Sequence, residues 1–578
     1  MTDPRPDALP GPRERSVARA GAAAIFLAVA VIGVYSAFFP TLESRFASIQ
    51  SDVGDPLLSV YLLEHESLVL HRPGYVGTLW SPPFFFPARR VLAYSESMLG
   101  ILPFYLLLRP WCSPTLAYQI VVILLLVLCY VAMLALLRSL GARPLLAALG
   151  AALFAFGLPR EAQIGHLHML PAFYSPLALL ALRRLLASPG RGSLALLLGL
   201  LYLQLLSSIH LGWFLFLGLA LLVPLWLLYD HAAVRRLAAF CRRRPLFVSL
   251  SVIAWLALTY VTFRPYLQAG RELGYRSWET VMPFLPALRT WLTVPAGSLY
   301  ARLLPTYPLH APLTWERYLF PGFVFLGLAL VAGFHLFLAR RGAADEPHDL
   351  AADRPLLRAC WWAAVVLVLV SLVVPRLAVA GWRVHRAYPG VTLWWYVFRL
   401  VPGAKAFRAA LRVWTVIYLF GIVAVIGGAE AALRRARLAP WVSGLLMAPL
   451  LGLGLLEQHV GDLQSRAKRP FLEQVERIRA QIHPGCAALY ATVGQGQPFY
   501  VSQLTAMWAG LEANVPTVNG YSSNLPPRYP NPDRTMTPEE LGRWAGGPVC
   551  VVLVPRAGSA LAAPSGYAEA SPAPLAAR

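Results

Sequence analysis

Charged residues are scarce in this sequence, and acidic residues are the scarcest of them. Only 13% of the 578 residues are charged, whereas soluble domains average about a quarter. The 50 Lys and Arg outnumber the 28 Asp and Glu, which gives a net charge of +22. The arginines lie between apolar runs and no soluble basic domain is present, so no nucleic-acid partner is expected. The composition excludes an ordinary soluble enzyme and indicates basic loops of a membrane protein.

Sequence fingerprints for metals and nucleotides are absent too. The six cysteines form no C-x-x-C pair, and no His and Cys cluster shows zinc spacing. Neither G-x-x-x-x-G-K-[ST] nor G-x-G-x-x-G occurs, so neither nucleotide-binding fingerprint is present. Cys486 and Cys550 each stand at the start of a strand-like run. Outside the cytoplasm they could form a disulfide, and the alternative is two buried thiols.

Long apolar runs are abundant in the sequence, of which 57% is hydrophobic. They lie near residues 21–40, 116–137, 145–158, 169–187, 194–210, 212–229, 246–263, 319–339, 359–375, 413–433 and 440–456. A bilayer crossing takes about 20 residues, so we predict about eleven spanning helices, the first of them uncleaved. The expected fold class is mainly α, a polytopic transmembrane helical bundle over residues 21–456.

Positive charge alternates along the connections between these runs. The arginine-rich connections are 138–143, 183–191, 235–244, 340–358 and 434–437, and each falls on the side of the N-terminal tail, residues 1–20. The positive-inside rule therefore places that tail in the cytoplasm. The outer side then receives the loops 41–115, 264–318 and 376–412, together with everything after residue 456.

The chain changes character after the last apolar run. The segment "FLEQVERIRAQI" has helical periodicity, "AALYATV" and "VCVVLVP" are short β-type runs, and Thr537 is placed to cap a helix in "TPEELGRWAG". We predict a small extracytoplasmic α/β domain over 457–560. The residues 561–578, rich in Ala and Pro, are expected to be disordered.

Two carboxylates stand together where the chain leaves the first apolar run. Asp52 and Asp55 flank Gly54 in "SDVGDPLLSV", and a glycine there could supply a tight turn. A general base must lie within about 3 Å of the proton it takes, so it needs such a fixed backbone. An amphipathic interfacial helix with solvated acids is the alternative interpretation.

A short outer loop, "PREAQIGHLHML", contains Glu161, His166 and His168. Two histidines without a third ligand at suitable spacing argue against a metal site. The remaining interpretations are hydrogen bonding to a sugar or phosphate, and histidines satisfied at the membrane interface. Glu316 directly precedes another spanning run in "APLTWERYLFPG".

The outer segment 376–412 has cations and no acid. They are Arg376, Arg383, Arg386, Arg399, Lys405, Arg408 and Arg412. Such a segment favours an anionic partner, either a lipid-carrier phosphate or the headgroups of the bilayer. The spacings of three and four predict that Lys405, Arg408 and Arg412 share one face of a helix that enters the membrane.

The arrangement of these parts resembles the GT-C superfamily of integral membrane glycosyltransferases, and more narrowly its bacterial mannosyltransferase and YfhO-like groups. The matching stretches are "GDPLLSVYLLEHE", "VLAYSESMLG", "AFGLPREAQIGHLHMLPAFYSPLALLAL", "ERYLFPG", "FRAALRVW" and "VPTVNGYSSNLPP". The resemblance covers nearly the whole chain, and it rests on arrangement more than on any one string.

The resemblance implies an inverting transferase in a bacterial inner membrane. It would move a sugar from a polyprenyl-phosphate donor to an extracytoplasmic lipid, glycan or protein acceptor. The catalytic acid of the family falls on Asp55, with Asp52 as its neighbour. Substrate contacts would come from Glu161, His166, His168, Glu316, Lys405, Arg408 and Arg412. The second outer loop lacks the aspartate that many members have. No metal ligands are therefore assigned, and the involvement of a Mg or Mn ion is left open.

Two other functions fit the same sequence. A lipid or polysaccharide transporter or flippase would want ionisable residues in mid-membrane, and the predicted helix interiors are nearly free of charge. A non-catalytic envelope assembly protein would keep the fold and the outer domain without the chemistry.

Overall fold

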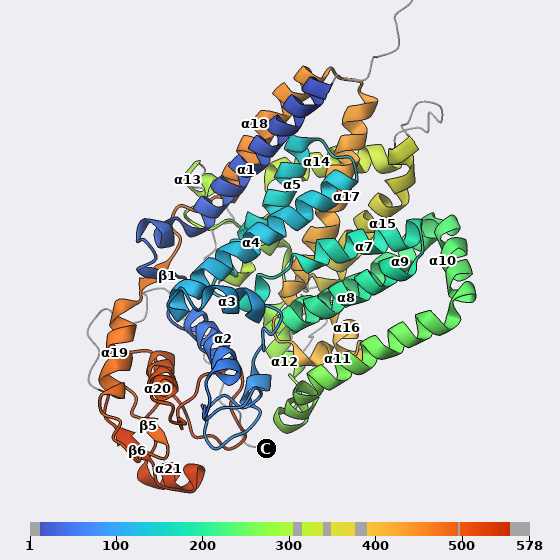
Figure 1. Ribbon diagram of the computed structural model, residues 1–578. Helices are drawn as coiled ribbons and strands as arrows, with labels where there is room; N and C mark the ends of the chain where they lie inside the picture. Colours follow the sequence, from blue (N-terminus) through green and yellow to red (C-terminus); the bar gives the residue numbers. More distant parts are fainter. Residues whose placement is uncertain (1–11, 304–314, 339–347, 376–389, 495–496, 555–578) are drawn as a thin grey trace, which may run out of the picture.

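The computed structural model describes residues 12–303, 315–338, 348–375, 390–494 and 497–554, and within them the chain is a bundle of long apolar helices (Figure 1). The eleven helices that match the predicted runs are α1 (Pro12–Glu43), α4 (Pro114–Ser139), α5 (Pro144–Phe156), α7 (Tyr174–Ala187), α8 (Arg191–Ser207), α9 (Ile209–Tyr229), α11 (Pro245–Leu273), α14 (Phe323–Gly333), α15 (His348–Ser371), α17 (Trp414–Arg435) and α18 (Pro440–Gln458).

Nine of the helical segments in the described residues are long and apolar enough to cross a membrane, and the helices at Arg191–Ser207 and Phe323–Leu338 are shorter apolar ones. The prediction of a mainly α, multi-pass bundle is confirmed. Its boundaries needed correction, because α1 begins at Pro12, inside the stretch assigned to the tail, and α11 continues to Leu273. The rest of the tail and residues 561–578 lie outside the described residues.

Helix α5 lies at the centre of one half of the bundle and packs against α1, α4, α17 and α18. Its sequence is mostly Ala, Leu and Gly, and small residues let helices approach closely where hydrophobicity alone does not drive association. At Gly150 an added Cβ would lie 2.7 Å from the Leu137 side chain and 2.8 Å from that of Ile426. This close packing fixes the C-terminal end of α5. From there the chain turns toward the segment 162–173, called the histidine loop here because it contains His166 and His168.

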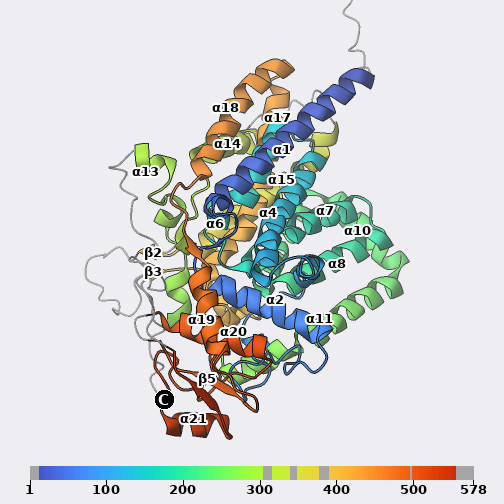
Figure 2. The same ribbon diagram turned by 60° about the vertical axis from the view of Figure 1, so that its left-hand side comes forward.

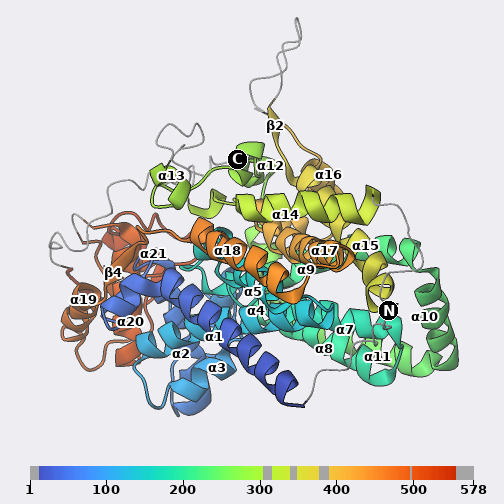
Figure 3. The ribbon, with the colours of Figure 1, turned by 90° about the horizontal axis from the view of Figure 1, so that it is seen from above.

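The remaining helices lie at the two ends of the bundle. They are α2 (Asp55–His71), α3 (Leu102–Leu108), α6 (Leu158–Glu161), α10 (His231–Arg243), α12 (Trp278–Val281), α13 (Leu299–Leu303), α16 (Trp394–Leu400), α19 (Arg469–Arg479), α20 (Phe499–Ala513) and α21 (Pro538–Ala545). Figure 2 shows α19, α20 and α21 together at the end opposite to the start of α1. Figure 3 shows α10 on the far side from them.

Short strands tie the chain together at the end where α1 stops. The strands are β1 (Ser48–Gln50), β2 (Val374–Pro375), β3 (Gly390–Val391), β4 (Ser465–Ala467), β5 (Leu489–Ala491) and β6 (Cys550–Val552). Strand β1 pairs antiparallel with β4, and the Ser51 N–H donates to the Gln464 carbonyl at 2.9 Å. The segment after the first spanning helix is thereby fastened to the segment after the last one, directly before Asp52.

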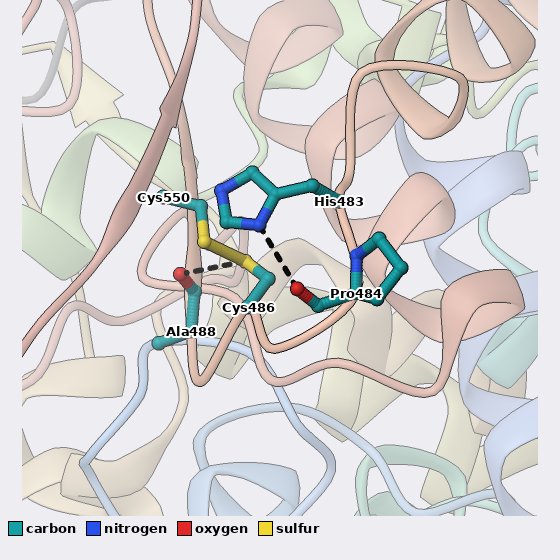
Figure 4. The surroundings of a disulfide bond; sticks show 5 residues. All are labelled: His483, Pro484, Cys486, Ala488 and Cys550. Atoms are coloured by element: carbon teal, nitrogen blue, oxygen red, sulfur yellow. Dashed lines mark hydrogen bonds between the residues drawn. A yellow bond between two sulfur atoms is a disulfide. The ribbon is translucent and has the colours of Figure 1, made fainter.

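The C-terminal segment has the predicted mixture of helices and strands. Strands β5 and β6 pair in parallel, α19 packs on α20, and α20 packs on α2. Thr537 caps α21 by accepting from the Glu540 N–H at 3.2 Å, as its sequence predicted. A disulfide joins Cys486 to Cys550, whose Cα atoms are 5.8 Å apart (Figure 4). The disulfide interpretation of these two cysteines is confirmed.

The bundle provides a test of its own topology, because two partly exposed cysteines lie at its opposite ends. Cys112 precedes α4 at the end that holds β1, whereas Cys241 lies in α10. We expect a membrane-impermeant maleimide to label Cys112 from the outside of intact cells and Cys241 only in inside-out vesicles. Labelling of both from one side would contradict an odd number of crossings between the start of α4 and α10.

Candidate functional site

A cavity of about 230 Å³ opens where α1 ends and α2 begins. Five of the residues that the sequence singled out line it: Asp52, Asp55, Glu161, His166 and Glu316. They come from three segments of the sequence, and more than 90 positions separate each segment from the next. The last turn of α1 and the link before β4 complete the wall of the cavity. Three segments that are far apart in the sequence therefore meet at one cavity, whereas Lys405, Arg408 and Arg412 do not line it.

Local backbone geometry places the two aspartates side by side on this wall. The Gly54 N–H donates to Asp52 Oδ1 at 2.7 Å, which closes a turn between β1 and α2. An added Cβ at Gly54 would lie 3.1 Å from that oxygen and 3.3 Å from the Tyr500 ring, so the close approach favours glycine. Asp55 begins α2 with Pro56 behind it, at the positive end of the helix dipole.

Both oxygens of Asp55 are held by distant parts of the chain. The Tyr521 hydroxyl donates to Oδ1 at 2.9 Å, and His166 Nε2 lies 3.1 Å from Oδ2. Burial opposes the charged form, but the hydrogen bond and the charge of His166 outweigh it and lower the pKa of Asp55. Asp55 is therefore an ionised, fixed carboxylate, and each oxygen keeps a free lone pair toward the cavity.

Asp52 has the opposite electrostatic environment. Burial raises its pKa, the negative charge of Asp55 raises it further, and the Gly54 N–H only partly offsets both effects. Two neighbouring carboxylates whose pKa values are pushed apart have distinct proton affinities, which is the condition for one to stay charged while the other exchanges a proton.

His166 connects Asp55 to a second acid–base pair. Its Nε2 lies 3.6 Å from Glu316 Oε1, and the same oxygen accepts a hydrogen bond from Arg412 Nη2 at 2.7 Å. Burial works against both charged forms. Nevertheless the two carboxylates raise the pKa of His166, and Arg412 with His166 lowers the pKa of Glu316 to about 2. Four charged groups thus neutralise one another beside the cavity.

The network continues away from the cavity through two more histidines. Arg412 Nη1 lies 3.0 Å from His168 Nε2, and because a guanidinium has no acceptor, that nitrogen of His168 must be the unprotonated one. The His168 and His210 rings lie 5.3 Å apart, centroid to centroid. Glu96 bonds the His210 ring and accepts from the Ile209 N–H at 2.8 Å, which caps α9. His168 is thus a neighbour of the cavity and does not line it.

The prediction that Lys405, Arg408 and Arg412 share a helix face is wrong. Residues 404–406 and 410–413 form two short 3₁₀ turns with extended backbone between them, and α17 begins only at Trp414. Each side chain consequently points elsewhere. Arg412 is 7% exposed and reaches Glu316, Arg408 lies over the Phe284 ring at 4.7 Å, and Lys405 lies 5.9 Å from that of Phe398. Three cations of the same segment, Arg376, Arg383 and Arg386, fall outside the described residues.

Arg408 has a cationic neighbour that the sequence gave no reason to select. Burial lowers the pKa of Arg276, and the positive charge of Arg408 lowers it further. The guanidinium of Arg276 donates to Asn524 Oδ1 at 2.6 Å, and the backbone N–H of Arg276 donates to the Lys405 carbonyl at 2.9 Å. The charge of Arg408 also reaches Glu316. The positive charges of Arg276 and Arg408 favour an anionic ligand in the neighbourhood of Glu316.

Glu161 lines the cavity but is only 3% exposed, and its neighbour Arg160 is buried. Arg160 donates to the Met169 carbonyl at 2.6 Å and lies over the Trp414 ring at 4.9 Å. These contacts tie the histidine loop to the start of α17 and so fix His166 in place.

The donor set does not fit a divalent cation. Among the described residues, no three His, Cys, Asp or Glu side chains are arranged to hold a metal ion. The two carboxylates that could start such a set already have cationic partners, Asp55 with His166 and Glu316 with Arg412. A metal ion here would have to displace an arginine that is itself largely buried.

Two groups of the site escaped the sequence interpretation. Tyr521 lies in the stretch "VPTVNGYSSNLPP", to which the sequence assigns no individual role, and its contact with Asp55 joins positions 466 apart. His210 begins a long apolar run, which gives no polar signal by itself. A hydroxyl or ring nitrogen directly at the edge of an apolar or turn segment is the only hint that either position carries.

Comparisons with known proteins complete the description. No protein-family model matches the chain, and no curated protein matches it. Two structures of an archaeal oligosaccharyltransferase from Archaeoglobus fulgidus are similar at 13% identity. The apo form has a TM-score of 0.37 over 86% of this chain. The form in complex with an inhibitory peptide and a dolichol-phosphate has 0.38 over 87%. This chain spans 64% of the length of each.

The ion pair of His166 and Asp55 makes a prediction for stability against pH. The pKa of His166 is raised above its ordinary value of 6.5, so its stabilisation is fully present below that pH and is lost as the pH rises through the raised pKa. We expect His166→Gln to cost roughly 1.5–3 kcal/mol near pH 5.5, the usual size for a hydrogen bond to a charged group.

The measurement is the melting temperature of both proteins in detergent from about pH 5 to about pH 9. The gap between wild type and His166→Gln should narrow as the pH rises. A gap that stays constant or widens would mean that His166 is neutral throughout and that its bond to Asp55 is not an ion pair.

Proposed function

We propose that this chain is a membrane glycosyltransferase, which moves a sugar from a polyprenyl-phosphate donor to an acceptor hydroxyl at the outer face of the membrane in which it lies. The single observation that carries the proposal is the cavity in which a fixed, ionised Asp55 and a second carboxylate of raised pKa, Asp52, lie side by side at the exit of a spanning helix. The proposed inner-membrane location and cytoplasmic N-terminus follow from the arginine bias of the connections.

The size and polarity of the cavity suit a sugar ring. Drug-sized ligands occupy roughly 300–1,000 Å³, and this cavity holds about 230 Å³. Carboxylates, Gln50 and His166 line it together with the apolar residues Ala37, Pro40 and Pro56. A small ligand with many hydroxyl groups and some apolar surface matches that mixed lining.

The two aspartates have different roles in the proposed reaction. Asp55 accepts a hydrogen bond from the acceptor hydroxyl and orients its oxygen toward the anomeric carbon. As the new carbon–oxygen bond forms and the bond to phosphate breaks, the hydroxyl proton passes to Asp52, whose raised pKa suits a proton acceptor. The sequence interpretation left Asp55 either to orient or to deprotonate the acceptor hydroxyl, and its lowered pKa fits the orienting role better. A single displacement of this kind inverts the anomeric configuration.

The leaving phosphate is the anion for which Arg276 and Arg408 are placed. Negative charge grows on the bridging oxygen as the glycosidic bond breaks, and fixed cations there stabilise the transition state more than the ground state. Arg408 is near enough to Glu316 for its charge to be felt there, so the phosphate would lie at the edge of the cavity. Arg412 already neutralises Glu316, and we assign it the role of fixing the histidine loop against the start of α17.

Replacement of Asp55 by Asn tests this proposal. Asn keeps the shape and can still bond Tyr521, but it lacks the charge that pairs with His166. We expect release of polyprenyl phosphate from a panel of polyprenyl-phosphate monosaccharides to fall roughly 100-fold or more. The detergent-solubilised yield should change little, and the melting temperature should fall no further than it does in His166→Gln, because both substitutions remove the same ion pair. Asp52→Asn should also slow the reaction and should remove the acidic limb of the pH–rate profile.

Asp533→Asn is the matched control, because Asp533 is an exposed acid of the same outer domain that lies away from the cavity. It should leave the rate unchanged. A folded Asp55→Asn protein that transfers sugar at the wild-type rate would rule out the proposed chemistry and would favour the assembly-protein interpretation.

A further inference from the structure

A second cavity, of about 500 Å³, lies at the other end of the bundle. It is bounded by the turn between α7 and α8 and by α10, and four arginines line it: Arg191, Arg236, Arg243 and Arg244. His210 marks the Asp55 end of α9, and α10 follows the far end of that helix. The 21 residues of α9 rise by about 30 Å, so a bilayer thickness separates the two cavities.

The arginines of this cavity have almost no acidic counterpart. Asp230 caps α10 by accepting from the Ala233 N–H at 2.9 Å, and its other oxygen accepts from Arg236 at 3.1 Å. Within the part of the chain that the structure describes, Arg191, Arg243 and Arg244 have no carboxylate within ion-pair distance. Their combined charge is available to a ligand.

Three arginines elsewhere at this end of the bundle have acidic partners. Arg183 forms two hydrogen bonds with Asp353, at 2.7 and 2.8 Å. Arg434 bonds Glu430 at 2.7 Å, and Arg143 lies 3.3 Å from the same carboxylate. Positive-inside sorting explains why arginines are present on this side, but it does not explain why three of them face one hollow without a partner.

An unoccupied apolar surface begins where the cavity ends. Helix α11 follows Arg244 directly, and several apolar side chains of its first turns lie at the surface of the described protein. Leu246 is 72% exposed, and Leu250 and Ile253 are each 59% exposed. Arg191 lies over the Phe247 ring at 5.5 Å, so the cationic wall and the apolar helix meet at the cavity mouth.

We propose that the cavity beside α10 binds the phosphate headgroup of an anionic phospholipid whose acyl chains lie along α11. A phosphate diester satisfies the unpaired arginines, which favour bidentate contacts with phosphate oxygens. A lipid also covers the exposed leucines with hydrocarbon, which a soluble phosphate compound does not. Basic hollows between helices at a membrane surface are where such headgroups bind. The inference does not depend on the proposed sugar transfer.

The test is lipid binding by the full-length protein, measured by native mass spectrometry in detergent with added phosphatidylglycerol or phosphatidylcholine. Wild type should bind phosphatidylglycerol in clear preference. Arg243→Gln with Arg244→Gln should weaken that binding by roughly tenfold to thirtyfold, since each arginine near the surface contributes to the attraction of an anionic lipid.

Arg235→Gln with Arg242→Gln is the matched control, because it removes the same charge from α10 at residues that do not line the cavity. Its binding should stay within about twofold of wild type, as the proposed site is local. Arg191→Gln, on the opposite wall, provides a second variant should the α10 pair fail to fold, and it should also weaken binding.

Equal effects of the two α10 pairs would overturn the site, as would a wild-type protein without preference for the anionic lipid. Competition with glycerol 3-phosphate distinguishes a lipid headgroup from a soluble phosphate compound as the ligand. If it displaces phosphatidylglycerol completely at equal concentration, the cavity binds a soluble phosphate compound, and the lipid assignment is wrong.

Discussion

The carboxylate of Asp55 is the interaction on which the rest of this structure depends. Its side chain is partly exposed at the cavity, and it stays ionised because His166 and Tyr521 bond its two oxygens. Those partners come from the second outer loop and from the C-terminal segment, so one charge joins three distant parts of the chain. Removing His166 would leave the charge of Asp55 without its cationic partner, a state that proteins avoid. The spanning helices, in turn, have to end where these partners can meet.

The spanning bundle and the outer segments thus act as one unit at this end. Pairing of β1 with β4 fastens the exit of α1 to the exit of α18, and α20 covers α2. Tyr521 reaches Asp55 from the segment that the disulfide between Cys486 and Cys550 helps to hold. The C-terminal segment therefore contributes a hydroxyl group that holds Asp55 in the wall of the cavity.

Much of the fold was accessible from sequence, because a bilayer forces the backbone of each crossing to satisfy its hydrogen bonds within a helix. All eleven apolar runs proved helical. Five of the selected site residues line one cavity, yet their convergence joins positions such as 55 and 316, which no local pattern relates. Helical spacing misled at Arg408 and Arg412, because two 3₁₀ turns replace the expected helix there. Arg276 and His210 carry no local signal, and only packing brings them to the site.

The most direct measurement of the central claim is an experimental structure of the protein with a polyprenyl-phosphate monosaccharide, determined by cryo-electron microscopy. The account predicts a sugar ring within hydrogen-bond reach of Asp55 and Asp52, and a phosphate between Arg276 and Arg408. A donor bound elsewhere on the bundle, or a sugar with no contact to either aspartate, would contradict it.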